Sequence, residues 1–150
     1  MLTGPEITQV LTDAGVATFD GYCPDKDYSL TTKAWLVLPF ARALRSFCES
    51  FNIGSWEAEI NDCDDFSRTA AMFAQACHNH TSKEDPTRQE TALAFGEFFY
   101  TKDDGEGHAI NVAIIRNDKG EHEAIFFEPQ NQTVVELTQT EKESCAFFRF

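Results

Sequence analysis

The chain has 150 residues, 42% of them hydrophobic and 14 of them Phe, which is one domain's length and enough for a single closed core. This composition excludes wholesale disorder. With 25 acidic and 12 basic side chains the formal charge is -13, and such a surface repels nucleic-acid phosphates and anionic lipid. We therefore expect a single domain over residues 1–150 that binds neither nucleic acid nor a membrane.

The five cysteines, an odd number, show no paired CxxC spacing, so neither a disulfide framework nor a zinc ribbon is predicted. The N-terminus lacks the basic and apolar regions of a signal peptide. The longest apolar run, residues 34–41, is interrupted by Pro39 and is too short to span a bilayer. The sequence therefore predicts a soluble protein with reduced thiols, and it leaves the compartment and the oligomeric state open.

Helices are predicted in the first half of the chain, from capping residues and from apolar side chains at helical spacing. Their expected ranges are residues 4–13, residues 33–51, and a helix that begins at Asp62 or Cys63 and ends near His78. Pro39 is expected to kink or divide the second helix, because its ring removes a helical hydrogen bond and clashes with the preceding turn. Residues 1–54 thus form a helical N-terminal part.

Strands are predicted in the second half, where β-branched and aromatic residues alternate with polar ones between turn signals. The expected strands are residues 92–100, 107–116, 123–128, 133–137 and 145–150. The predicted fold class is α+β, with helices first and an antiparallel sheet second.

Three residues in this arrangement could form a catalytic site: Cys63 at a helix start, His108 at a strand start and Glu128 at the end of the next strand. The unpaired N–H groups of a helix N-terminus lower a thiol pKa and favour a nucleophile. If the hairpin turn is centred on Asp118 and Lys119, the residue numbers of paired positions sum to about 237, which brings Glu128 beside His108. The carboxylate could then fix the imidazole tautomer and leave the other ring nitrogen for the thiol.

Each of these residues also has a structural interpretation. A cysteine on an apolar helical stripe is usually a small core residue, and a histidine at a strand start is commonly a surface residue. A glutamate before a proline often only ends a strand. The functional interpretation depends on the joint appearance of the three residues in an order compatible with one site.

Short motifs around these residues resemble those of papain-like cysteine peptidases. The resemblance is strongest to the papain-like, calcium-dependent peptidase domain that follows the lectin domain in the agglutinin of the fairy-ring mushroom and its relatives. The matching segments cover roughly residues 55–130 and are Trp56, Asn61 to Asp65, Gly107 to Ala109 with Asn111, and Glu128 to Gln130.

The resemblance implies a papain-like fold, with N-terminal helices packed on a C-terminal antiparallel sheet, and a peptide or protein substrate. It assigns Cys63 as the nucleophile, His108 as the base and Glu128 as the group that orients the base, with Trp56, Gln130 and Asn111 lining the site. Two features depart from the family. The oxyanion glutamine expected before the nucleophile is absent from residues 55–62, and no β-trefoil repeat is present, so carbohydrate binding does not follow.

Acidic side chains crowd the start of the helix that carries Cys63. Glu59, Asp62, Asp64 and Asp65 lie within a few residues of the thiol, and like charges oppose formation of a thiolate. One interpretation is helix capping, with Asp62 as the N-cap and two acids in the first turn. The other is that these oxygens bind a hard cation. The resemblance favours calcium, or manganese in its place.

The primary functional hypothesis is a cation-dependent cysteine peptidase that uses a Cys63, His108 and Glu128 triad. The same triad would serve an amidase or a deamidase. A different alternative is a non-catalytic calcium-binding or protein-interaction module, for example in a phage or host-interaction assembly.

Overall fold

The computed structural model describes residues 1–17, 20–54, 57–58, 60–84 and 90–150. The helices are α1 (Gly4–Asp13), α2 (Lys33–Trp35), the π-helical turn η1 (Leu36–Phe40), α3 (Ala41–Ser50), α4 (Cys63–Glu84) and α5 (Gln139–Glu143). The strands are β1 (Gly21–Tyr22), β2 (Tyr28–Ser29), β3 (Ala92–Leu93), β4 (Phe95–Thr101), β5 (Gly107–Arg116), β6 (His122–Glu128), β7 (Thr133–Val135) and β8 (Phe147–Arg149).

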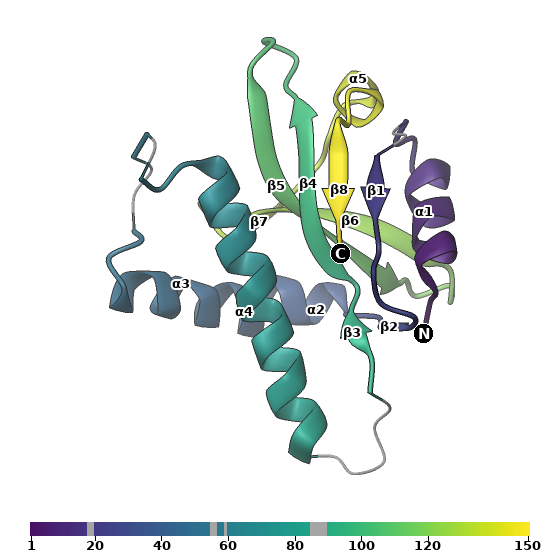
Figure 1. The fold of residues 1–150 in the computed structure, drawn as a ribbon, viewed down its shortest axis with the longest axis horizontal. Coiled ribbons are helices and arrows are strands. Elements are labelled where there is room, and N and C mark those ends of the chain that lie inside the picture. Colours follow the sequence, from purple (N-terminus) through teal and green to yellow (C-terminus); the bar gives the residue numbers. More distant parts are fainter. Residues whose placement is uncertain (18–19, 55–56, 59, 85–89) are drawn as a thin grey trace.

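A six-stranded sheet in the order β1-β8-β4-β5-β6-β7 forms the centre of the molecule (Figure 1). All neighbours are antiparallel except β1, which runs parallel to β8, and a separate parallel pair joins β2 to β3. The predicted α+β class, with helices and a large antiparallel sheet, is confirmed. None of the described helices is long and apolar enough to span a bilayer.

Two hydrophobic cores lie on the two faces of this sheet. Alternate residues of β5 point to opposite faces, so Ile110 and Ile114 pack with α1 while Ala113 and Ile115 pack with η1, α3 and α4. In the second core, which lies between the sheet and η1, α3 and α4, Phe40 is at the centre of an aromatic cluster. Its ring contacts those of Trp35, Phe73, Phe95 and Phe127, at centroid distances of 4.5, 6.1, 5.1 and 5.5 Å.

The predicted disturbance at Pro39 is confirmed, and its form is a π-helical turn. The Thr32 hydroxyl accepts a hydrogen bond from the Trp35 amide at 3.1 Å, so the helix begins as the capping residues predict. Pro39 lies inside η1, and the wider turn accommodates the proline without ending the helix, which continues as α3.

The predicted end of α4 near His78 is wrong, because the helix continues to Glu84. His78 is buried, and its Nε2 lies 3.0 Å from the carbonyl oxygen of Thr91, the residue before β3. One turn later the Thr81 hydroxyl donates to the Cys77 carbonyl within the helix. The contact of His78 with Thr91 therefore attaches the helix to the segment before β3, and this contact could not be predicted from local sequence.

Most predicted strands are confirmed, with changes at their ends. β5 has the predicted bounds, and β6 begins one residue early. The expected strand 92–100 is divided at Ala94 into β3 and β4, which pair with β2 and β5. The short β1 and β2 and the helix α5 are absent from the prediction. A capping box of Thr138 and Glu141 begins α5, and this motif was visible in the sequence.

Candidate functional site

The structure brings His108 and Glu128 together at the open end of the β5–β6 hairpin. The imidazole Nε2 and the Glu128 carboxylate are 2.7 Å apart, and both side chains are largely buried, with 16% and 14% exposed. Arg116 pairs with His122, so residue numbers in the hairpin sum to 238 (116 + 122), one more than the turn arithmetic predicted. The side chains of His108 and Glu128 meet even though the strand register differs by one residue from the predicted register.

The surroundings of the imidazole are partly apolar. Tyr100 lies opposite His108 on β4, with ring centroids 5.8 Å apart in an edge-on arrangement. Burial raises the pKa of Tyr100, and the charges of Glu141, Glu128 and Cys63 raise it further. The second Glu128 oxygen accepts a hydrogen bond from the Gln130 amide at 3.1 Å. Both carboxylate oxygens therefore have partners.

Cys63 begins α4, as predicted, and is partly buried. In the described part of the chain, its sulfur makes no hydrogen bond with His108, whose Nε2 faces Glu128. Burial raises the pKa of the Cys23 thiol to about 11 and also raises the pKa values of Cys48 and Cys77. The part of the predicted triad that the structure joins by a hydrogen bond is the pair of His108 and Glu128.

Asn111 connects α4 to the sheet. It is fully buried, and its amide nitrogen donates to the carbonyl oxygens of Ser67 and Gly96 at 2.9 and 3.1 Å. The Ser67 hydroxyl in turn donates to the Ile110 carbonyl at 2.7 Å. These contacts hold the first turns of α4 against β4 and β5. Two further predicted site residues, Trp56 and Glu59, lie outside the described residues.

The predicted acidic cluster is present at the start of α4. Carboxylate oxygens of Asp62, Asp64 and Asp65 lie within 4.8 Å of one another. The pKa of Asp64 is raised, mainly by a side-chain hydrogen bond with Asp62. Desolvation and the negative charges of Asp62 and Asp65 raise it further. Arg68 partly offsets this charge through contacts of 3.1 Å to Asp64 and 3.4 Å to Asp65. A set of hard oxygen donors with excess negative charge fits a calcium-type cation.

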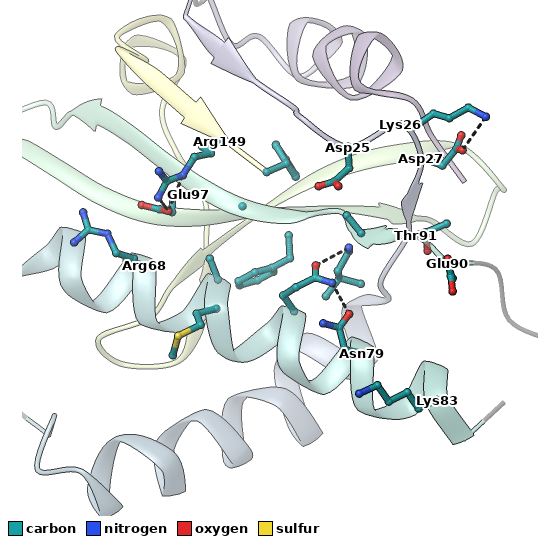
Figure 2. A pocket seen from close by; sticks show the side chains of 18 residues that line it. Asp25, Lys26, Asp27, Arg68, Asn79, Lys83, Glu90, Thr91, Glu97 and Arg149 are labelled. Atoms are coloured by element: carbon teal, nitrogen blue, oxygen red, sulfur yellow. Dashed lines mark hydrogen bonds and ion pairs between the residues drawn. The ribbon is translucent and has the colours of Figure 1, made fainter. Parts of the chain in front are cut away.

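A groove of about 1250 Å³ runs beside α4, and the sequence analysis did not predict it (Figure 2). Its walls are α4, the β3 and β4 strands, the segment around Asp25 and the end of β8. The side-chain amide of Gln75 links α4 to β3, because its oxygen accepts a hydrogen bond from the backbone amide of Leu93 at 2.9 Å. Its nitrogen donates to the side chain of Asn79, on the same helix, at 2.8 Å.

The charges in this groove are balanced. It contains four basic residues and four acidic ones, although the whole chain carries a formal charge of -13. These residues are Lys26, Arg68, Lys83 and Arg149, and Asp25, Asp27, Glu90 and Glu97. One third of the 12 basic side chains of the protein therefore gather at a single groove.

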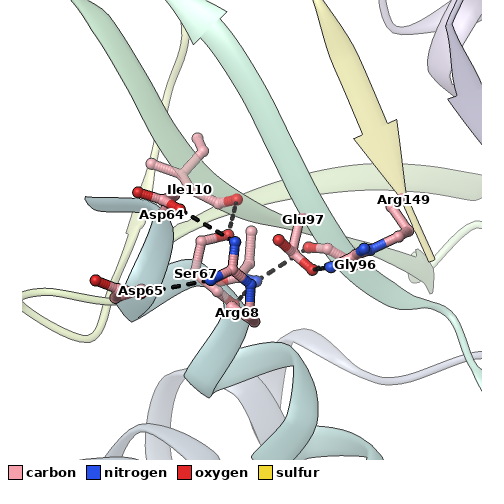
Figure 3. A network of polar contacts seen from close by, with 9 residues as sticks. Asp64, Asp65, Ser67, Arg68, Gly96, Glu97, Ile110 and Arg149 are labelled. Atoms are coloured by element: carbon pink, nitrogen blue, oxygen red, sulfur yellow. Dashed lines mark hydrogen bonds and ion pairs between the residues drawn. The ribbon is translucent and has the colours of Figure 1, made fainter. Parts of the chain in front are cut away.

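Polar contacts join the acidic cluster to this groove (Figure 3). Arg68 lines the groove and also contacts Asp64 and Asp65. Beside it, Glu97 is only 4% exposed, and its carboxylate accepts from two nitrogens of Arg149, with Nε at 3.1 Å. The buried glutamate is thus held by a guanidinium, as a buried charge requires.

Comparisons with known proteins identify similar solved structures. No protein-family model matches the chain, and no curated protein matches its sequence. A complex of PSL1a with E64 is similar over 99% of this chain, with a TM-score of 0.69 and 25% identity. Polyporus squamosus lectin bound to the human-type influenza-binding epitope Neu5Acα2-6Galβ1-4GlcNAc is similar over 99% of this chain, with a TM-score of 0.66 and 24% identity. The chain spans about half the length of each, 50% and 49%.

These comparisons correct the functional hypothesis. Both of these similar structures are of a lectin, and one of them is bound to a sialylated glycan. The cysteine-peptidase resemblance, the hydrolase activity and the peptide or protein substrate are therefore contradicted. The sheet matches the lectin structures and is not specifically papain-like. The amidase and protein-interaction alternatives do not cover carbohydrate recognition either.

Proposed function

We propose that this chain is a carbohydrate-binding module of a lectin-type protein and that the groove beside α4 is its sugar site. The observation that carries the proposal is the charge-balanced polar lining of a groove of about 1250 Å³ on an otherwise acidic chain. The similarity to a lectin over 99% of the chain supports it.

The lining suits a ligand rich in hydroxyl groups. A sugar hydroxyl both donates and accepts hydrogen bonds, so it needs acceptors such as Asp25 and Asp27 together with donors such as Lys83. Asn79 is exposed and offers both kinds of group. Met72, which is 60% exposed, provides an apolar surface for the C–H face of a sugar ring.

Calorimetric titration with Neu5Acα2-6Galβ1-4GlcNAc tests this function. We expect saturable binding by the wild type. Asn79→Ala should bind about tenfold more weakly, because this variant loses the side-chain amide that would hydrogen-bond to sugar hydroxyls. The matched control is Asn131→Ala, an exposed asparagine at the β6–β7 turn, which should bind like the wild type. Absence of binding, equal effects of the two variants, or calcium-dependent turnover of casein by the wild type would contradict the proposal.

We also propose that Asp62, Asp64 and Asp65 bind calcium, or manganese in its place. The proximity of three carboxylates within 4.8 Å supports this site, and the raised pKa of Asp64 is consistent with their mutual repulsion. A bound cation would replace Arg68 as the neutralising charge at the start of α4 and would help hold the first turn of the helix.

Calcium should raise the thermal unfolding midpoint of the wild type, because a ligand that binds only the folded state stabilises it. At a hundredfold excess over the dissociation constant the gain is about 2.7 kcal/mol. Asp64→Asn should abolish the shift, whereas Asp118→Asn, in the exposed β5–β6 turn, should retain it. An equal calcium response in both variants would exclude this cluster as the binding site.

A further inference from the structure

Part of strand β6 has a neighbouring strand on one side only. β7 pairs with β6 over residues 126–128, and after Val135 the chain leaves the sheet and forms α5. Residues 122–125 of β6 pair with β5, whereas no described strand covers their other side. Alternate residues of a strand direct their N–H and C=O groups to the same edge, so this open edge offers backbone donors and acceptors to a further strand.

A small pocket lies along this open edge. Its volume is about 300 Å³, and its lining comes from β6, the end of β7, the end of α1 and Lys142 of α5. Four apolar side chains of the core beneath α1 take part in the lining, namely Val10, Ala124, Phe126 and Val135. The pocket therefore offers an apolar surface to a side chain of a segment that lies along the edge.

Carboxylates outnumber basic groups around this pocket. Asp13, Glu123 and Glu136 are exposed and line it, together with Lys142 and His122. Within the described ranges, Glu123 and Glu136 make no ion pair. The whole chain also carries a formal charge of -13, so a second copy of it would be repelled here while a basic segment would be attracted.

The alternation of side chains along β6 adds a sequence requirement. Ala124 belongs to the core beneath α1, and the side chain of the preceding Glu123 points to the opposite face of the sheet. A strand added at this edge would alternate in the same way. Aliphatic residues on its one face would meet the pocket, and basic residues on its other face would meet Glu123.

We propose that the open edge of β6 binds an extended segment of a partner protein in which aliphatic and basic residues alternate. The segment adds a strand beside residues 122–125 and is bound without being cleaved. The pocket at this edge shares no lining residue with the groove beside α4. The inference therefore goes beyond the proposed carbohydrate binding and does not depend on it.

Fluorescence anisotropy with a labelled Val-Lys-Val-Lys-Val-Lys peptide tests this surface. The wild type should bind the peptide saturably and should not bind Val-Glu-Val-Glu-Val-Glu. Two further peptides carry N-methyl groups on the backbone nitrogens of either the valines or the lysines. One of them should bind about tenfold more weakly and the other like the parent peptide, because only alternate amides face β6.

Charge reversal at the edge supplies the protein variants. Glu123→Lys and Glu136→Lys should each weaken binding of the basic peptide by about fivefold, the upper range for an exposed ion pair. Glu49→Lys is the matched control, because Glu49 is exposed on α3 and does not line the pocket. This variant should bind like the wild type. Amide chemical shifts of ¹⁵N-labelled protein should change on residues 122–125 when the peptide binds.

Several outcomes would overturn the inference. They are no binding of the basic peptide, equal weakening by both methylation patterns, an equal loss in Glu49→Lys, and shift changes confined to the groove beside α4. Concentration-dependent dimerisation of the wild type that changes the shifts of residues 122–125 would assign the edge to a second copy and would also overturn it. Failure of sugar binding together with the expected peptide results would refute the carbohydrate proposal alone.

Discussion

Phe40→Ala is expected to lower the free energy of unfolding by about 3–5 kcal/mol, the range for removal of a buried aromatic ring. Phe40 is 1% exposed, and its ring packs against four other aromatic rings between η1, α4 and the sheet. Such a loss is a large part of the total stability of a domain of this size. Urea unfolding followed by circular dichroism measures it.

Phe51→Ala is the matched control for Phe40→Ala. Phe51 follows α3, is 65% exposed, and contacts only the ring of Phe47 among the aromatic side chains of the described residues. The same chemical change there should cost less than about 1 kcal/mol, because it leaves no buried cavity. Comparable losses in the two variants would contradict the assignment of Phe40 to the centre of the second core.

Gly96→Ala is the second substitution with a large expected effect, about 1–3 kcal/mol of lost stability. A Cβ atom at Gly96 would lie 2.2 Å from the carbonyl oxygen of Arg149 and 2.9 Å from the Cα of Phe150. Both atoms belong to the backbone at the end of β8, so the added methyl can fit only if β4 and β8 move apart. Thermal unfolding of the variant measures the loss.

Gly107→Ala provides the comparison for Gly96→Ala. Gly107 begins the neighbouring strand β5, its φ is not positive, and a Cβ atom there would meet nothing within 4 Å. The substitution should leave stability unchanged or raise it slightly, because alanine reduces the entropy of the unfolded chain. A greater loss in Gly107→Ala than in Gly96→Ala would contradict the close approach of β8 to β4.

The fold was largely predictable where local patterns decide the structure. Apolar spacing and caps identified α1 and the start of α4, and alternation identified β5 with its bounds. The two-residue strands β1 and β2 could not be predicted, because each exists only through pairing with a distant strand. The end of α4 was missed for a related reason, since the contact of His78 with Thr91 is tertiary.

The candidate site was predictable only in part. Hairpin pairing is local, so the approach of Glu128 to His108 followed from the turn. The position of the thiol relative to this pair depends on how a helix packs on a sheet, and sequence spacing does not determine that. The peptidase hypothesis combined short motifs of common residues, and the comparison with lectin structures over the whole chain contradicts it.

The groove could not be recognised from the sequence. Its lining comes from residues 25–27, from one side of α4, from residues 90–97 and from the chain end at Arg149 and Phe150. No local motif joins these segments, and the balance of charge becomes visible only when they are placed together. Its four basic residues, Lys26, Arg68, Lys83 and Arg149, are far apart in the sequence.

A titration of ¹⁵N-labelled protein with Neu5Acα2-6Galβ1-4GlcNAc, followed by amide chemical shifts, tests the central claim most directly. The account predicts saturable shifts that concentrate at the groove, on Gln75, Asn79, Lys83 and Thr91. No saturable shifts, or shifts centred on the His108 and Glu128 pair in place of the groove, would contradict it.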